Sequence, residues 1–185
     1  MRKSLYVVKL MLFLVAFMIT GKNYLCGDMS SLFDDNIAII NVSKVNNKSI
    51  FIKTSRIKYS NDNPYVKGGW WGTDSWLEKT THGWRLKNVQ KPKYLLNTIQ
   101  VIIQNNEIII PLSAYCDLAE PYKILLKSNE KGFVLSIFGG SASTSYQADL
   151  IFEKNRFVSR KVFSAEFPSK CWEKTVYQFN LNDMM

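Results

Sequence analysis

The stretch SYQADLIF at residues 145–152 alternates between polar and apolar side chains as far as Leu150. Successive side chains of a β-strand point to opposite faces, so this period predicts a half-buried strand. Its expected core face holds Tyr146, Ala148, Leu150 and Phe152, and its other face holds Ser145, Gln147 and Asp149. The short connection EKN at 153–155 leads into a second β-rich run, RFVSRKVF at 156–163. Together the two runs predict an antiparallel hairpin.

Similar β-branched and aromatic runs continue along the chain in both directions. Nine runs predict strands, at residues 36–42, 49–59, 98–104, 107–112, 122–127, 133–138, 145–152, 156–163 and 172–180. The connections are short, and Asn105-Asn106 predicts a tight turn because Asn tolerates a positive φ. Consecutive short strands joined by tight turns predict an all-β fold, an antiparallel meander that forms a sandwich or a barrel.

Two details of this fold follow from local patterns. The apolar runs at 101–103 and 108–110 predict a central hairpin that is covered on both faces. Near the end of the chain, Cys171, Glu173, Thr175, Tyr177 and Phe179 share one strand face, and Tyr177 and Phe179 are expected to point inward.

Helix signals after residue 27 are weak. Ser75 and Glu78 have the spacing of a capping box, but Gly83 and the threonines before it limit any helix there to one or two turns. A second short turn is expected within 113–120, before Pro121. Little helix is therefore expected apart from the leader described next.

Residues 1–27 have the three parts of a secretory signal peptide. Arg2, Lys3 and Lys9 make the start positive, LMLFLVAFMI at 10–19 is an apolar run, and Gly21 or Gly27 offers a cleavage site. The run is half the length that a membrane-spanning helix needs, which disfavours an anchor. A lipid anchor on Cys26 is disfavoured by the large Leu25 before it. We therefore expect a secreted or periplasmic protein, with residues 28–185 forming a single β-rich domain.

The cysteines fit an oxidising compartment. Cleavage after Gly27 removes Cys26 and leaves Cys116 and Cys171, an even pair that predicts a disulfide. Two buried free thiols are the alternative. A catalytic thiol is disfavoured because it needs a histidine base, and His82 is the only histidine.

The charge balance points weakly to an anionic partner. The chain has a net charge of +9; four of its 24 basic residues and none of its 15 acidic residues lie in 1–27, which leaves 20 against 15. A/T-rich codon usage would give the same excess of lysine. No run of like charge is dense enough for a nucleic-acid stripe, so we expect a protein or a cell-envelope glycan as partner, no nucleic acid, and membrane contact only through the signal segment. The oligomeric state is not indicated.

Few catalytic mechanisms remain open with one histidine. A zinc site built from His82 and the two late cysteines lacks ligand spacing, and no phosphate-binding glycine motif occurs, so no cofactor or metal is expected. The carboxylate pair Asp74 and Glu78 is the one enzymatic route left, as a small cell-envelope hydrolase. The small-residue stretch GGSASTS at 139–145 suggests either a loop that grips a ligand or a bend between strands.

The most unusual segment is PYVKGGWWGTDSWLEKTTHGWR at 64–85, which holds four of the five tryptophans. Exposed tryptophans bind sugars and partner proteins, whereas buried ones would cap one end of the fold. We list as ligand-binding candidates Trp70, Trp71, Trp76, Trp84 and His82. The sequence thus favours a non-catalytic binding domain of a bacterial envelope; an inhibitor or immunity-type protein and the Asp74/Glu78 hydrolase are the alternatives.

Overall fold

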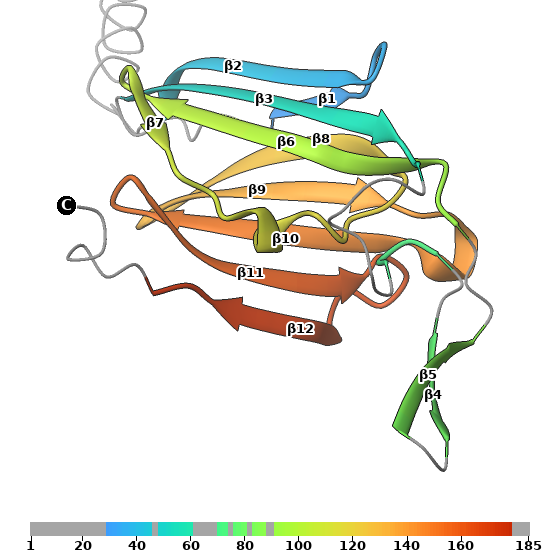
Figure 1. The fold of residues 1–185 in the computed structure, drawn as a ribbon. Helices are drawn as coiled ribbons and strands as arrows, with labels where there is room; N and C mark the ends of the chain where they lie inside the picture. The colour runs from blue at the N-terminus through green and yellow to red at the C-terminus, as the bar shows by residue number, and fades with distance from the viewer. Residues whose placement is uncertain are drawn as a thin grey trace, which may run out of the picture.

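The computed structural model describes residues 29–45, 48–60, 70–73, 76–80, 83–87 and 91–178. The described residues form twelve strands and two short 3-10 helices. The strands build a six-stranded sheet, a four-stranded sheet and a separate two-stranded hairpin (Figure 1). The two larger sheets pack as a sandwich, which confirms the all-β antiparallel fold and selects the sandwich over the barrel. The leader at 1–27, Cys26 included, lies outside the described residues.

The six-stranded sheet contains the stretch that the sequence predicts best. Its order is β1 (Met29–Leu32), β8 (Pro121–Asn129), β9 (Gly132–Gly139), β10 (Tyr146–Glu153), β11 (Arg156–Ser164) and β12 (Cys171–Val176). The last five strands form an antiparallel meander. Between β10 and β11, Lys154 and Asn155 both have positive φ, of 48° and 63°. Such a turn matches the twist of the flanking strands and fixes their register.

The four-stranded sheet has the order β2 (Ile37–Val45), β3 (Lys48–Lys58), β6 (Tyr94–Ile103) and β7 (Asn106–Ile108). The tight turn before β7 uses Gln104 and Asn105, with φ of 48° and 68°, one residue earlier than the sequence predicts. The prediction of a central hairpin covered on both faces is wrong. Strand β7 is short and lies at the sheet edge, and Ile109 just after it is 58% exposed.

A two-stranded hairpin projects away from the sandwich (Figure 1). It consists of β4 (Trp76–Thr80) paired with β5 (Gly83–Lys87). The helical turn expected after Ser75 is therefore wrong: the backbone from Trp76 onward is extended. A capping box stabilises a helix only if the following residues continue it, and here Thr80 pairs with Gly83 instead.

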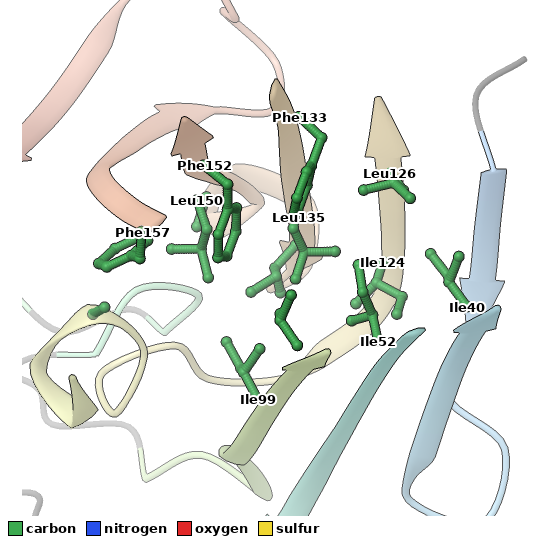
Figure 2. Packing of buried hydrophobic residues seen from close by; sticks show 14 of the residues in the cluster. Ile40, Ile52, Ile99, Ile124, Leu126, Phe133, Leu135, Leu150, Phe152 and Phe157 are labelled. Carbon is green, nitrogen blue, oxygen red and sulfur yellow. The ribbon is translucent and has the colours of Figure 1, made fainter. Parts of the chain in front are cut away.

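The core lies between the two larger sheets, where their apolar faces meet (Figure 2). The four side chains expected on the core face of β10, namely Tyr146, Ala148, Leu150 and Phe152, are all fully buried. The ring of Phe152 stacks on Phe133 with centroids 4.5 Å apart. Tyr177 packs against this core as expected, while Phe179 lies outside the described residues.

The connection between β7 and β8 adds an irregular second layer over β10 and β11. It contains the 3-10 helix η1 (Leu112–Ala114), which realises the short turn expected within 113–120, and it passes in front of β10 (Figure 1). Isolated bridges join it to its neighbours: Ala119 pairs with Leu95, and Leu118 pairs in parallel with Trp71. The Trp70–Thr73 segment is thereby fixed at one end of the sandwich. This end holds the groups considered next.

Candidate functional site

The first two tryptophans of the Trp-rich segment lie in different environments. Trp70 is 6% exposed and packs with Leu95 and Ala119, and its ring meets that of Tyr59 edge to face with centroids 5.6 Å apart. Its ring is closed off by the domain itself, as the end-cap interpretation expects. Trp71 is half-buried. The two neighbours therefore do not form one exposed aromatic surface.

Trp71 is held by both its backbone and its ring. Its backbone N–H donates to Asp117 O at 3.0 Å, and its indole Nε1 donates to Glu173 Oε2 at 3.2 Å. The ring lies nearly parallel to Trp172, with centroids 5.4 Å apart. Trp172 is the extra residue of a β-bulge opposite Val162, and a bulge redirects side chains in this way. Sequence reasoning gave Trp172 no role in the site.

A buried arginine ties this end together. Arg160 of β11 is 1% exposed and donates through two nitrogens to Asp117, at 2.6 and 2.7 Å. It also donates to Glu173 Oε2 at 3.0 Å and to the Ser113 carbonyl at 3.4 Å. Burial lowers the pKa of Arg160, but the hydrogen bond and charge of Asp117 and the charge of Glu173 outweigh it, so the pKa is raised. Both carboxylates are committed to this cation, so the cluster serves as a structural clamp rather than as a proton donor.

The predicted disulfide is wrong: Cys116 and Cys171 are both free. Cys116 is next to Asp117, whose side chain binds Arg160, whereas Cys171 pairs with Phe163, three residues further along β11. The Cys171 thiol donates instead to the carbonyl of Glu173 at 3.1 Å, and burial raises the pKa of the Cys116 thiol.

Two glycine-containing loops dock against each other beside this clamp. Gly72 and Gly140 have positive φ, of 92° and 75°. A Cβ on Gly72 would lie 2.8 Å from Ala119 O and 3.1 Å from the Cα of Gly140, so this contact admits only glycine at both positions. The docked loops line a cleft of about 520 Å³, within the range of small-ligand sites.

We call this cavity the glycine cleft. One group of its described lining residues comes from the two loops: Gly72, Thr73, Gly140, Ser141 and Thr144. The other group comes from Arg56 and from the ends of β6 and β8: Lys91, Pro92, Lys93, Tyr94, Glu120 and Tyr122. These residues lie in five separated segments of the sequence. The stretch at 139–145 is thus both the predicted bend and a wall of a cavity.

The described lining residues of the glycine cleft carry predominantly positive charge. Arg56, Lys91 and Lys93 face a single carboxylate, Glu120, among the described lining residues. Glu120 Oε1 accepts hydrogen bonds from the backbone N–H groups of Lys93 and Tyr94, so the carboxylate also anchors the start of β6. A cavity with an excess of cations favours an anionic group.

Arg56 is the most firmly positioned of these cations. Its Nε donates to Asn36 Oδ1 at 3.2 Å and its Nη1 donates to the Pro121 carbonyl at 3.0 Å. Its guanidinium carbon lies 4.5 Å from the ring centroid of Tyr94 and 5.4 Å from that of Phe33. These contacts hold the charge in place before any ligand arrives.

Polar groups complete the cleft. Ser141 and Thr144 bond to each other across the 3-10 helix η2 (Ala142–Thr144): the Ser141 N–H donates to Thr144 Oγ1, which donates to the Ser141 carbonyl at 2.7 Å. Tyr122 is 44% exposed at the lining. Hydroxyl groups and an accessible ring are the features that bind sugars in proteins.

The remaining predicted site residues lie elsewhere. His82 and Asp74 lie outside the described residues, and for Trp76, Trp84 and Glu78 the structure gives the strand backbone of β4 and β5 but not the side chains. The Asp74/Glu78 pair therefore stays a prediction. In the described part of the chain, no group of three or more His, Cys, Asp or Glu residues is arranged to hold a metal ion.

A second, smaller cavity of about 340 Å³ lies at the other end of the sandwich. Lysines line it too, among them Lys48, Lys131 and Lys154, together with the core rings Phe133 and Phe152. Lys48 Nζ donates to Asn155 Oδ1 at 2.9 Å. This cavity provides a matched reference for the glycine cleft because it carries similar charges in a different setting.

The chain matches no protein-family model, and comparison with curated proteins and with solved structures gives no match either. Where the structure describes the chain, no helix has the length and hydropathy needed to span a bilayer. Function is therefore argued from the geometry of the glycine cleft.

Proposed function

We propose that this protein is a non-catalytic binding domain that acts outside the cytoplasm and holds its ligand in the glycine cleft. The observation that carries the proposal is the cleft itself, about 520 Å³ in volume and lined by polar and cationic groups from five segments. Its walls are preformed, because the Gly72–Gly140 contact and the Arg56 hydrogen bonds fix them. Preformed sites bind with a smaller loss of conformational entropy.

The binding role is favoured over catalysis by the chemistry of the described lining. Glycoside hydrolysis needs two carboxyl groups across the bond to be cleaved, and Glu120 is the single carboxylate among the described cleft residues. One of its oxygens is committed to two backbone N–H groups. Asp117 and Glu173 lie nearby but are paired with Arg160.

The location outside the cytoplasm is supported by the leader at 1–27, with its positive start and ten-residue apolar run. A partner in that compartment is a cell-envelope glycan or a protein. The hydroxyl groups and the exposed ring of Tyr122 favour the glycan.

Filling the cleft tests this function. In Ser141→Trp the indole would occupy the cleft, and binding of the full chain to insoluble cell-wall glycan in a sedimentation assay should be lost. Ser143→Trp is the matched control, because it places the same ring on an exposed residue of the same loop that lies outside the cleft lining. The control should keep binding, with both variants folded by their melting temperatures. Equal binding by Ser141→Trp and the unchanged protein would contradict the proposal.

A further inference from the structure

The cations of the glycine cleft suggest what kind of glycan it takes. Arg56 and Lys93 both lie over the ring of Tyr94, with the guanidinium carbon at 4.5 Å and the ammonium nitrogen at 5.2 Å from its centroid. Lys91 lines the same cavity two residues before Lys93. Three cationic residues thus line one concave site, where low-dielectric walls strengthen their field.

The carboxylate in the cleft does not cancel this field. Glu120 contributes one negative charge against three positive ones among the described lining residues, and its Oε1 is turned to the backbone N–H groups of Lys93 and Tyr94. Arg56 uses Nε and Nη1 in the protein, while its Nη2 makes no hydrogen bond to the described residues. A guanidinium fixed on one side and available on the other is suited to an oxyanion.

The cavity is larger than an isolated oxyanion requires. Its lining adds the exposed ring of Tyr122 and the hydroxyls of Ser141 and Thr144 to the three cations. An aromatic ring packs against the apolar face of a sugar, and hydroxyl groups bond its oxygens. The combination matches a sugar that carries a negative group.

Resting on the proposed function, we propose that the glycine cleft binds an acidic glycan, with the phosphate or carboxylate group of one sugar unit held by Arg56, Lys91 and Lys93. The ring of Tyr122 then packs against the sugar. The shared chemistry is the oxyanion, and phosphorylated and uronic acid glycans are its two sources.

Charge-matched variants of the full chain test this inference. The double variant Lys91→Gln/Lys93→Gln removes two cleft cations, and Lys131→Gln/Lys154→Gln removes two exposed lysines at the other cavity. The probes are oligosaccharides of equal length that are neutral, phosphorylated or rich in uronic acid. We expect at least about tenfold weaker binding of an acidic probe by the first double variant, about the value of one charged hydrogen bond, and less than twofold change for the second.

Each outcome bears on the inference. Binding of either acidic probe but not the neutral one, with the loss confined to the cleft variant, supports it, and the probe that binds identifies the source of the oxyanion. Equal binding of neutral and acidic probes overturns the acidic preference while leaving the proposed function intact if Ser141→Trp still abolishes binding. Equal losses in the two double variants indicate general charge attraction and overturn the cleft assignment. Absence of binding to every probe overturns the inference.

Discussion

Two regions of the molecule, the β10–β11 hairpin and the segments around Trp71 and Asp117, show two ways of building structure from the same chain. The β10–β11 hairpin is a continuous antiparallel ladder with one register shift, between Ile151 and Phe152. Its turn has two residues with positive φ, and the inner face of β10 is fully buried. The segment around Trp71 and Asp117 is held by single-residue bridges, a buried arginine and two docked glycines. The first is specified locally, and the second exists only when distant segments meet.

This difference bears on where a binding site can form in the molecule. Regular strands present repeating surfaces, whereas irregular connections over a rigid sheet bring unlike groups together, which is where binding sites concentrate. The glycine cleft is formed at the irregular end, and its walls depend on the sandwich beneath. The predictions below test this dependence, beginning with the largest effect.

Loss of the arginine clamp should give the largest loss of unfolding free energy. Arg160→Ala leaves Asp117 and Glu173 without their buried cation, and breaking such a cluster costs about 3–5 kcal/mol. Denaturant unfolding measures this loss. Lys161→Ala, one residue along β11 and on the outer face, should change stability by no more than about 0.5 kcal/mol. Equal effects of the two substitutions would show that Arg160 is not a clamp.

The tryptophans should divide by burial rather than by sequence proximity. Trp70→Ala removes a buried ring and should cost about 3–5 kcal/mol of unfolding free energy. Trp172→Ala removes a ring that is 38% exposed and stacked on Trp71, and should cost about 1–1.5 kcal/mol. Thermal unfolding monitored by circular dichroism measures both. A larger loss for Trp172 than for Trp70 would reverse the assignment of Trp70 to the core.

The docked glycines should be sensitive to a single methyl group. Gly72→Ala places a Cβ at positive φ and 2.8 Å from Ala119 O, and should cost about 1–3 kcal/mol. Ser143→Ala, exposed in the facing loop and outside the cleft lining, should be nearly neutral. Stability of Gly72→Ala within experimental error of the unchanged protein would refute the close contact between the loops.

Tyr146, whose hydroxyl joins β10 to Ala119, should make the stability of the fold sensitive to high pH. Full burial, followed by the charge of Asp117, raises the pKa of Tyr146 well above its usual 10.0, and its hydroxyl donates to Ala119 O at 3.0 Å. Below the unfolded pKa both states keep the proton. Above it the unfolded state ionises first, so stability should fall as the pH rises past about 10. Tyr146→Phe should cost about 1 kcal/mol at neutral pH and reduce the slope above pH 10. An unchanged slope would contradict this role.

The contrast also explains what could be predicted from the sequence. Alternation from residue 145 to 150 identifies the core face of β10, because a one-residue slip would turn Tyr146, Ala148 and Leu150 outward. The turn before β7 is misplaced by one residue because Gln104 adopts a positive φ that its type does not favour. The β4–β5 hairpin was not predicted from the sequence, because its short strands lack a run of β-branched residues.

The site was harder to predict than the fold. The stretch 139–145 and the segment 64–85 drew attention by composition, but the cations Arg56, Lys91 and Lys93 carry no local signal. They meet only because β3, β6 and β8 bring their ends together. The disulfide failed for the same reason: an even count of cysteines says nothing about where each thiol lies, and both thiols are free in the structure.

Hydrogen exchange of the full chain, with and without a bound acidic oligosaccharide, tests most directly the claim that the ligand site lies at the irregular end. We expect slower exchange in peptides covering 72–73, 91–94 and 140–144, and unchanged exchange in the β10–β11 turn at 153–156. Ligand protection that falls on the turn and on Lys131 and Lys154, with none at the glycine cleft, would contradict the account.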